Sequence, residues 1–411
     1  MTNLKQNRSL VSRLSPAAVS AALTLVAALL SGVITIQSSQ AQTFKTLYSF
    51  KGGVDGQNPY ASLVRDAAGN LYGNTHFGGR SSACSPGCGL VFKLDSHGHK
   101  TLLHSFSGQP DGAWPYAGLI RDKAGNLYGT TYIGGSHNGG EVFKLNPMGK
   151  ATELYGFRGL ADGCEIIGSL LLDKSGTLYG TAFECGNGFG TVFKLSRTGT
   201  LTVLHEFVNG NSDGAYPALT TVVMDRRGAL YGTAQDGGPY NYGVVYMLNS
   251  NGKETVLHNF AGGAADGCYP SGNLVLDETG SLYGTTQQCG SSDGGVVWKL
   301  DKSGKETVLH SFAGGASDGA DPVAGVIPDA QGNFYGVTVL GGGTGCYGGY
   351  GCGTVFKLDR NGKETVLHSF TGGADGSSPS GGLIRDAQGN LYGTAVYGGS
   401  SNAGTAWKLT P

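Results

Sequence analysis

Residues 125–135 read GNLYGTTYIGG, and residues 389–399 read GNLYGTAVYGG. Weaker copies of the same phrase occur five more times. When the copies are aligned on their shared tyrosine, the intervals are 56, 51, 52, 52, 52 and 57 residues, and the seven positions are Tyr72, Tyr128, Tyr179, Tyr231, Tyr283, Tyr335 and Tyr392. A fixed period of this length is typical of a repeat fold. The two longer intervals come from insertions at 80–88 and 343–352.

Each repeat contains four short segments with the character of β-strands. In the last repeat these segments are ETVLHSF (364–370), GGLIRD (381–386), GNLYGTA (389–395) and GTAWKL (404–409). They are rich in β-branched and aromatic residues, and Gly, Asp, Asn or Pro bounds each one. No helical periodicity appears after residue 41. Seven such units predict an all-β fold, a seven-bladed β-propeller of four-stranded blades.

We expect this propeller to occupy residues 42–411, with repeats at approximately 44–100, 101–150, 151–200, 201–253, 254–305, 306–363 and 364–411. The two ends are offset by one strand, because the propeller region begins with a lone strand, FKTLYSF (44–50), and ends on the strand at 406–409. Pairing of the N-terminal strand with the C-terminal blade would close the ring and remove two exposed strand edges. An open β-solenoid is the competing fold. Solenoids need atypical capping repeats, whereas the first and last repeats here are ordinary.

The first 41 residues differ from the rest of the chain. Lys5, Arg8 and Arg13 form a basic start, an apolar run follows at 17–36, and the small residue Ala41 ends the segment. This order is typical of a secretory signal peptide that is cleaved after Ala41. The alternative is an uncleaved membrane anchor, since the run is near the length that spans a bilayer. We therefore expect a secreted or periplasmic, cell-envelope protein that contacts the membrane only if the signal segment stays uncleaved.

The charge balance excludes one class of partner. The 28 basic and 29 acidic residues nearly cancel, so the chain lacks the basic footprint that nucleic acid requires. Charged residues make up only 14% of the chain, which contains 74 glycines. This composition suits buried strands joined by tight turns. We expect a monomer that binds no nucleic acid.

The eight cysteines form four local pairs in the sequence. In two of the pairs the two cysteines are 21 residues apart, and these pairs occupy the same positions in two different repeats. In each of the other two pairs both cysteines lie within one inserted loop. Disulfides are typical of an exported chain, and the duplicated register favours them over free buried thiols. A zinc site is disfavoured because no histidine accompanies the close pairs. The predicted disulfides are Cys84–Cys88, Cys164–Cys185, Cys268–Cys289 and Cys346–Cys352.

Most of the recurring polar residues have structural explanations. Each tight turn before the LYG segment carries D-x-x-G, in which Gly supplies a positive φ and Asp bonds back to the turn amides. A histidine or tyrosine recurs once per repeat, and such residues cannot converge on a metal; they are Tyr48, His104, Tyr155, His205, His258, His310 and His368. A loop Asp-Gly pair also recurs, and ordinary turn chemistry explains it, with Ca²⁺ as the alternative ligand; the residues are Asp55, Asp111, Asp162, Asp213, Asp266, Asp318 and Asp375. We expect no metal and no cofactor, apart from this Ca²⁺ alternative.

The long loops of each repeat hold the candidate ligand-binding residues. The first long loop has one conspicuously variable position, occupied by Asn58, Trp114, Glu165, Tyr216, Tyr269, Asp321 and Ser378. Aromatic rings and carboxylates around the mouth of a central channel predict a sugar-binding surface. The alternative is that loop tips vary because nothing constrains them. The second long loop adds His76, Arg80, Tyr132, His137, Asp236, Tyr240, Tyr242, Tyr347, Tyr350 and Tyr397.

Evidence for catalysis is sparse. Glu165 and Asp321 are the candidates for an acid/base pair in glycoside cleavage, which needs carboxylates roughly 5–10 Å apart. Their blades lie nearly opposite each other, so we expect a larger separation. No Ser-His-Asp arrangement, HExxH motif, Walker loop or dinucleotide fingerprint is present. The sequence therefore favours a non-enzymatic module that binds a glycan or an envelope protein through its loop-rich face. The alternatives are an extracytoplasmic carbohydrate-active hydrolase or lyase, and a purely structural surface scaffold.

The phrases LYGTT..GG and G.VFKL, repeated with a period near 52 residues, resemble the GloVer-type (choice-of-anchor) tandem-repeat family. The resemblance implies a secreted bacterial protein with a propeller fold. Members often carry a C-terminal sorting anchor, which is not carried over here because Pro411 directly follows the last strand. NHL and kelch repeats are similar in architecture. A kelch-type copper oxidase would need a Tyr–Cys crosslink, and every cysteine here already has an expected partner.

Overall fold

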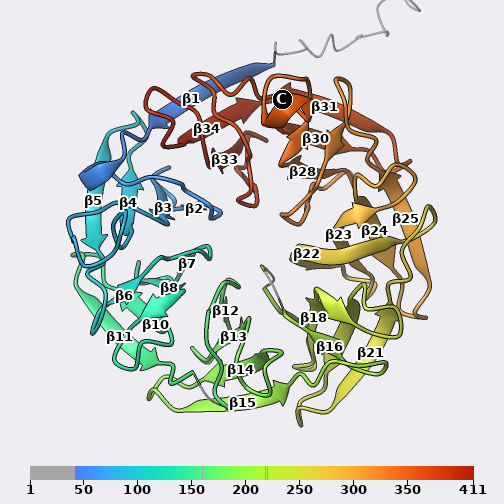
Figure 1. Cartoon of the computed structure of the whole chain (residues 1–411), viewed down its shortest axis with the longest axis horizontal. Coiled ribbons are helices and arrows are strands. Elements are labelled where there is room, and N and C mark those ends of the chain that lie inside the picture. The colour runs from blue at the N-terminus through green and yellow to red at the C-terminus, as the bar shows by residue number, and fades with distance from the viewer. Residues whose placement is uncertain (1–41, 160, 218, 220) are drawn as a thin grey trace, which may run out of the picture. The chain divides into compact units, whose positions relative to one another are not determined.

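The computed structural model describes residues 42–159, 161–217, 219 and 221–411, so the predicted signal segment at 1–41 lies outside the described residues. Residues 42–411 form one compact unit. Seven four-stranded antiparallel sheets are arranged in a ring (Figure 1). This arrangement confirms the predicted seven-bladed β-propeller.

Blades are numbered 1 to 7 along the chain, and the strands of each are given from the centre of the ring outward. Blade 1 contains β2 (Val64–Arg65), β3 (Leu71–Thr75), β4 (Leu90–Leu94) and β5 (Lys100–Ser105). Blade 2 contains β7 (Ile120–Arg121), β8 (Leu127–Thr131), β10 (Glu141–Leu145) and β11 (Ala151–Gly156). Blade 3 contains β12 (Leu171–Leu172), β13 (Leu178–Ala182), β14 (Thr191–Leu195) and β15 (Leu201–Glu206). Blade 4 contains β17 (Val223–Met224), β18 (Leu230–Ala234), β20 (Val244–Leu248) and β21 (Glu254–Asn259).

Blade 5 contains β22 (Gly267–Leu276), β23 (Leu282–Cys289), β24 (Val296–Leu300) and β25 (Glu306–Ser311). Blade 6 contains β27 (Ile327–Pro328), β28 (Phe334–Thr338), β30 (Thr354–Leu358) and β31 (Glu364–Ser369). Blade 7 contains β32 (Ile384–Arg385), β33 (Leu391–Ala395), β34 (Thr405–Thr410) and β1 (Thr43–Ser49). The long loops add three short ribbons, β6 (Gly112–Ala113) with β9 (Ile133–Gly134), β16 (Gly214–Ala215) with β19 (Asp236–Gly237) and β26 (Gly319–Ala320) with β29 (Leu340–Gly341). They also contain two 3₁₀ turns, η1 (Gly53–Asp55) and η2 (Tyr347–Gly349).

Blade 7 is built from both ends of the chain. Strand β1 pairs antiparallel with β34, and Phe44 lies opposite Leu409. The Phe44 ring also stacks on His368 of blade 6, with ring centroids 3.8 Å apart. Each blade consequently takes its outer strand from the start of the following sequence repeat, so blades and repeats are offset by one strand.

Aromatic pairs hold neighbouring blades together. A phenylalanine after each outer strand meets, edge to face, an aromatic residue on the third strand of the next blade; Phe50 and Phe92, for example, have ring centroids 5.1 Å apart. Both rings are fully buried. The glycine of the LYG phrase provides the space for the second ring, because a Cβ at Gly73 would lie 2.8 Å from the Phe92 ring. The glycine in this phrase is therefore a packing requirement.

The tyrosine of the phrase organises the tight-turn face. The Tyr72 hydroxyl donates to Asp66 Oδ2 at 3.0 Å, and the Asn70 side-chain amide donates to the same oxygen at 2.8 Å. The guanidinium of Arg121 from the next blade lies over the Tyr72 ring, 5.7 Å from its centroid. The repeated D-x-x-G-N-L-Y segment thus closes a turn and links two blades, which explains why one chain contains it so many times.

Replacing Tyr246 with Phe is expected to stabilise the protein by about 1–2 kcal/mol. The Tyr246 hydroxyl is fully buried and has no hydrogen-bond partner among the described residues, and a buried unsatisfied polar group costs about this much. Four other blades carry Phe here, at Phe92, Phe143, Phe193 and Phe356. Urea unfolding measures the effect. Tyr128→Phe is the control and should lower the free energy of unfolding, because Tyr128 donates a hydrogen bond to Asp122. Equal destabilisation by both variants would contradict the prediction.

Candidate ligand-binding site

The variable loop position has the same backbone conformation in every blade. All seven residues have φ between 53° and 59°, namely Asn58, Trp114, Glu165, Tyr216, Tyr269, Asp321 and Ser378. At Trp114 the backbone N–H donates to Cys88 O of the preceding blade at 2.8 Å, and its carbonyl accepts from Tyr132 N at 3.1 Å. Left-handed backbone is costly for most residues other than glycine, and less so for Asn and Asp. A chain with 74 glycines nevertheless places a side chain at each of these seven positions.

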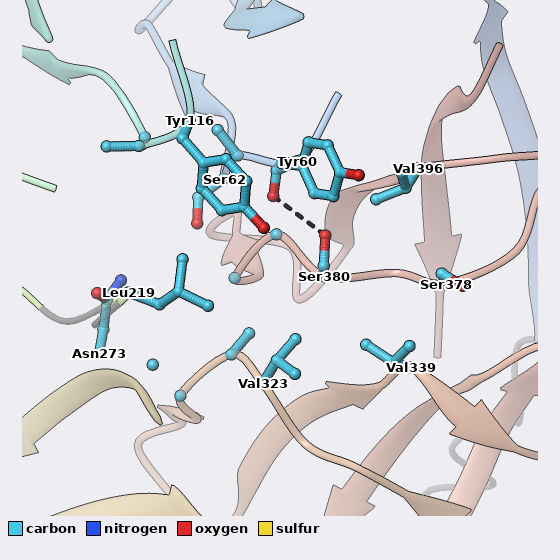
Figure 2. Close-up of a pocket in the computed structure, with 18 of the residues that line it drawn as sticks. Tyr60, Ser62, Tyr116, Leu219, Asn273, Val323, Val339, Ser378, Ser380 and Val396 are labelled. Carbon is cyan, nitrogen blue, oxygen red and sulfur yellow. Dashed lines mark hydrogen bonds between the residues drawn. The ribbon is translucent and has the colours of Figure 1, made fainter. Parts of the chain in front are cut away.

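A cavity of about 270 Å³ lies at the centre of the ring (Figure 2). We call it the mouth pocket, and its main lining residues are Tyr60, Tyr116, Asp321, Val323, Ser378 and Ser380. All seven blades contribute to its wall. The Tyr60 and Tyr116 rings stack with centroids 4.7 Å apart and an interplanar angle of 17°. These two rings form one apolar side of the mouth pocket.

Charge is almost absent from the mouth pocket. Among its described lining residues, Asp321 is the only carboxylic acid, and none is a lysine, arginine or histidine. Burial raises the pKa of Asp321 to about 6. Ser378 and Ser380 add hydroxyl groups to the lining of the mouth pocket. The Tyr347 hydroxyl lies 2.5 Å from Ser378 Oγ. A neutral ligand with hydroxyl groups suits this lining better than an ionic one.

A second cavity of about 510 Å³ adjoins the first and shares Tyr116, Ile167 and Leu219 with it. We call it the aromatic pocket, after His76, Phe77, Trp114, Tyr116, Tyr132 and Phe183. His76 meets Tyr116 edge to face, with centroids 5.3 Å apart. Burial lowers the pKa of His76 to about 4, so the imidazole is neutral at physiological pH.

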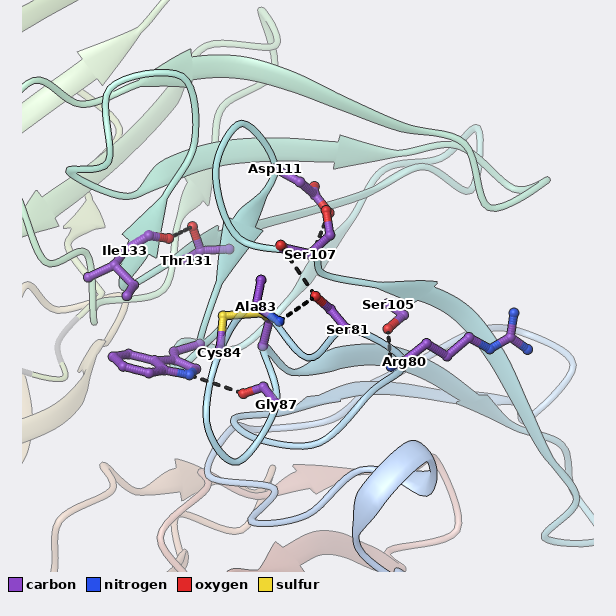
Figure 3. Close-up of a disulfide and its surroundings, with 12 residues drawn as sticks. Arg80, Ser81, Ala83, Cys84, Gly87, Ser105, Ser107, Asp111, Thr131 and Ile133 are labelled. Atoms are coloured by element: carbon purple, nitrogen blue, oxygen red, sulfur yellow. Dashed lines mark hydrogen bonds between the residues drawn. A yellow bond between two sulfur atoms is a disulfide. The ribbon is translucent and has the colours of Figure 1, made fainter.

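The indole of Trp114 is held by the inserted loop of blade 1. Trp114 Nε1 donates to the carbonyl of Gly87 at 3.1 Å, and the disulfide between Cys84 and Cys88 brackets that glycine (Figure 3). The ring is thereby fixed before any ligand arrives. A pre-ordered aromatic ring loses little conformational entropy on binding.

A third cavity of about 250 Å³ shares Tyr132 with the aromatic pocket. We call it the polar pocket, and Tyr132, His137, Arg158, Glu165 and the Cys164–Cys185 disulfide line it. Burial, together with a hydrogen bond to Glu165, raises the pKa of the Tyr132 hydroxyl. The aromatic pocket therefore adjoins the mouth pocket at Tyr116 and the polar pocket at Tyr132.

The structure divides the predicted site residues among these pockets. Trp114 lines the aromatic pocket, Glu165 the polar pocket, and Asp321 and Ser378 the mouth pocket. Asn58 is buried, and its side-chain amide donates to the carbonyl of Val396. The other two variable residues contact loop aromatics, Tyr216 against Phe183 and Phe189, and Tyr269 against Tyr242. Glu165 and Asp321 line separate cavities, so they do not face each other as an acid/base pair.

The second-loop candidates are also dispersed. Tyr347 and Tyr397 line the mouth pocket, and the Tyr397 hydroxyl lies 3.5 Å from that of Tyr60. His76 and Tyr132 line the aromatic pocket, and His137 lines the polar pocket. Asp236 lies in β19, Tyr242 packs against Tyr269, and Arg80, Tyr240 and Tyr350 are exposed.

Sequence reasoning missed Tyr60 and Tyr116, the stacked pair at the centre of the site. The available signal was the repeated tripeptide PYA at 59–61 and 115–117. Three other blades have Ile167, Val323 and Ser380 at the same position. This position directly precedes the predicted inner strand, and the sequence analysis gave it no role.

The loop aspartates and the recurring histidines and tyrosines form pairs. His104 Nε2 lies 3.1 Å from Asp111 Oδ2, and the hydroxyls of Tyr48 and Tyr155 donate to Asp55 and Asp162. The other histidines pair in the same way with Asp213, Asp266, Asp318 and Asp375. Since each histidine or tyrosine lies on the outer strand of a different blade and its aspartate lies in the loop that follows, the aspartates do not gather into one oxygen cluster. The four predicted disulfides are confirmed, and no described cysteine is free.

A family model described as the Gloeobacter/Verrucomicrobia repeat matches residues 30–223 and again residues 219–411. The chain belongs to this family. Membership in the Gloeobacter/Verrucomicrobia repeat family confirms the relationship that the phrases LYGTT..GG and G.VFKL indicated. No curated protein matches the chain in sequence.

Solved structures with a similar fold include two bacterial proteins. One is the extracellular domain of a protein provisionally described as a one-component system from B. thetaiotaomicron, with TM-score 0.55, 12% identity, and coverage of 89% of this chain and 40% of that one. Another is PorZ, a surface component of the type-IX secretion system of Porphyromonas gingivalis, with TM-score 0.53, 14% identity, and coverage of 87% and 47%. This member of the repeat family thus spans less than half the length of either chain. At these identities the likeness shows the propeller fold alone.

Proposed function

We propose that this chain is an exported, non-enzymatic binding module that holds a neutral glycan on its loop face. The observation that carries the proposal is the stacked Tyr60–Tyr116 pair, which joins the mouth pocket to the aromatic pocket. Aromatic faces cover the apolar faces of sugar rings, while their polar tips and nearby hydroxyls bond to sugar hydroxyls. The near absence of charge in the mouth pocket favours a neutral sugar over a uronic acid or an amino sugar.

Export is supported by the disulfides and by the signal-like segment. Four disulfides with no free described cysteine suit an oxidising compartment such as the periplasm, the cell envelope or the medium. Within the described residues, no helix is both long enough and apolar enough to span a bilayer. A binding rather than catalytic role is supported by the separation of Glu165 and Asp321 into different pockets, since glycoside cleavage needs two facing carboxyl groups.

The binding test uses residues 42–411 and a panel of neutral and charged oligosaccharides, screened by thermal shift and measured by calorimetry. A ligand that binds only the folded state raises the melting temperature. We expect a neutral glycan to bind, and Tyr116→Ala to weaken it by at least about 30-fold, the loss typical of a central aromatic contact. Tyr116→Phe keeps the stacked ring and loses only the hydroxyl, so it should weaken binding by no more than about tenfold, the contribution of one hydrogen bond.

The control for this test is Tyr240→Ala, which removes an exposed tyrosine of blade 4 that lines none of the three pockets. Its affinity should equal that of the wild type. If no neutral sugar produces a shift, the glycan proposal is wrong. An envelope protein is then the second candidate, which the exposed Tyr240 and Tyr350 side chains favour because exposed tyrosines are common in protein interfaces.

A further inference from the structure

A cluster of three ionisable side chains lies on the outer rim of the ring, away from the pockets. His205 belongs to β15 of blade 3, Asp213 to the loop that leads into blade 4, and Glu254 to the first position of β21. His205 Nε2 lies 3.1 Å from Asp213 Oδ1 and 3.8 Å from Glu254 Oε2. One nitrogen or oxygen atom from each residue falls within 4.8 Å of the other two. The cluster therefore joins the outer strands of two adjacent blades.

We propose that His205, Asp213 and Glu254 form a binding site for a divalent metal ion of the zinc class. A tetrahedral zinc with bonds of 2.0–2.1 Å places its ligand atoms about 3.3 Å apart, and the two separations measured from His205 bracket that value. Zinc accepts both histidine nitrogen and carboxylate oxygen as ligands, whereas hard ions such as Ca²⁺ prefer oxygen ligands alone. The fourth position would hold water, as in zinc sites with three protein ligands.

One carboxylate oxygen of the cluster has no hydrogen-bond partner in the described part of the chain. Glu254 Oε1 is buried and has no hydrogen-bond partner among the described residues, and the three side chains are 17%, 8% and 11% exposed for His205, Asp213 and Glu254. A carboxylate held in this way is a suitable ligand for a cation.

The neighbouring blades offer a matched comparison. Glu306 and Glu364 occupy the position of Glu254 in the next two blades, beside the pairs His258–Asp266 and His310–Asp318. In the described part of the chain, neither of these two His–Asp–Glu sets places one ligand atom from each residue within 4.8 Å of the other two, as His205, Asp213 and Glu254 do. The sequence analysis did not anticipate the site because it weighed the recurring histidines and the loop aspartates as separate sets, whereas Glu254 comes from the adjacent blade.

One other described cluster would disturb a metal titration. Asp95, His97 and His99 lie together on an exposed hairpin turn, where Asp95 Oδ1 already accepts the backbone amides of His97 and His99. The equivalent turn at 301–305 reads DKSGK. The double substitution His97→Ser and His99→Lys therefore reproduces a turn that the protein already contains and removes this competing site.

The experiment titrates Zn²⁺ and Co²⁺ into metal-free residues 42–411 carrying that double substitution. We expect one bound equivalent by elemental analysis after dialysis, visible absorption of tetrahedral Co²⁺, and a rise in melting temperature of roughly 2–5 °C with Zn²⁺. Glu254→Gln should weaken binding at least about 100-fold, since losing a ligand costs more than losing a supporting residue. Glu306→Gln should bind as the parent does.

A second variant separates metal binding from folding. His205→Tyr installs the residue that Tyr48 and Tyr155 provide at the same position in other blades. Its melting temperature in chelator should match that of the parent, and its metal response should be lost. Failure of the parent to retain any zinc, or equal retention by Glu254→Gln, overturns the proposal. The glycan test is independent, because none of the three residues lines the mouth, aromatic or polar pocket.

Discussion

A protein that lacks residues 42–51 is expected to lose more than about 5 kcal/mol of unfolding free energy, which is a large part of the total for a typical domain. The deletion removes β1, the outer strand of blade 7, and leaves the edge of β34 without a partner. It also removes Phe50, which is fully buried against blade 1. Truncation of a buried phenylalanine alone costs about 3–5 kcal/mol.

Urea unfolding and size-exclusion chromatography measure the effect of this deletion. We expect a shifted or absent unfolding transition and self-association through the open edge of β34. Adding a synthetic peptide of residues 42–52 should restore the transition in a concentration-dependent way, because the peptide supplies the missing strand. A monomeric deletion variant as stable as the parent would show that pairing of β1 with β34 contributes little to the ring.

Replacing Glu141 with Gln is expected to stabilise the protein by about 2–3 kcal/mol at pH 8 and by little at pH 4.5. Glu141 is 2% exposed, and burial, followed by the nearby Asp111 and Glu153, raises its pKa to about 9. Other blades have Leu90, Val244 or Thr354 at this position. Gln keeps the shape of the protonated acid and its hydrogen-bonding capacity, and it needs no proton from the solvent.

The sign of the pH dependence follows from proton binding. Between pH 4.5 and about 9 the folded protein holds the Glu141 proton and the unfolded chain has released it, so unfolding free energy falls as pH rises, by at most about 1.4 kcal/mol per unit. Glu254, Glu306 and Glu364 act in the same direction because burial also raises their pKa values. Stability of the wild type should therefore decline from pH 5 to pH 9.

The measurement is a series of urea unfolding curves from pH 4.5 to pH 9 for the wild type and Glu141→Gln. The difference between the two proteins should grow with pH. Glu278→Gln, on an exposed turn, is the control and should change stability by less than about 0.5 kcal/mol at every pH. Parallel curves for the wild type and Glu141→Gln would show that Glu141 ionises without penalty.

Local patterns in the sequence were sufficient for the architecture. The period of the LYG phrase specifies the number of blades, and the alternation of short apolar segments with Gly and Asp specifies four strands in each. The disulfides could be predicted because Cys164 and Cys185 lie in the two long loops of one blade, and Cys84 and Cys88 lie in one loop. These features depend on hydrogen bonds and loop lengths within a single repeat, which the order of residues determines directly.

Only the tertiary structure decided which side chains meet. Tyr60 and Tyr116 are 56 residues apart and stack because adjacent blades are rotated so that their inner strands converge. Trp114 faces the aromatic pocket because its backbone adopts a left-handed φ of 58° and its indole bonds to the carbonyl of Gly87. His205 and Glu254 meet across two outer strands in the same way. Such contacts depend on the angle and spacing between blades, which arise from the packing of buried aromatic rings and do not follow from the order of residues within one repeat.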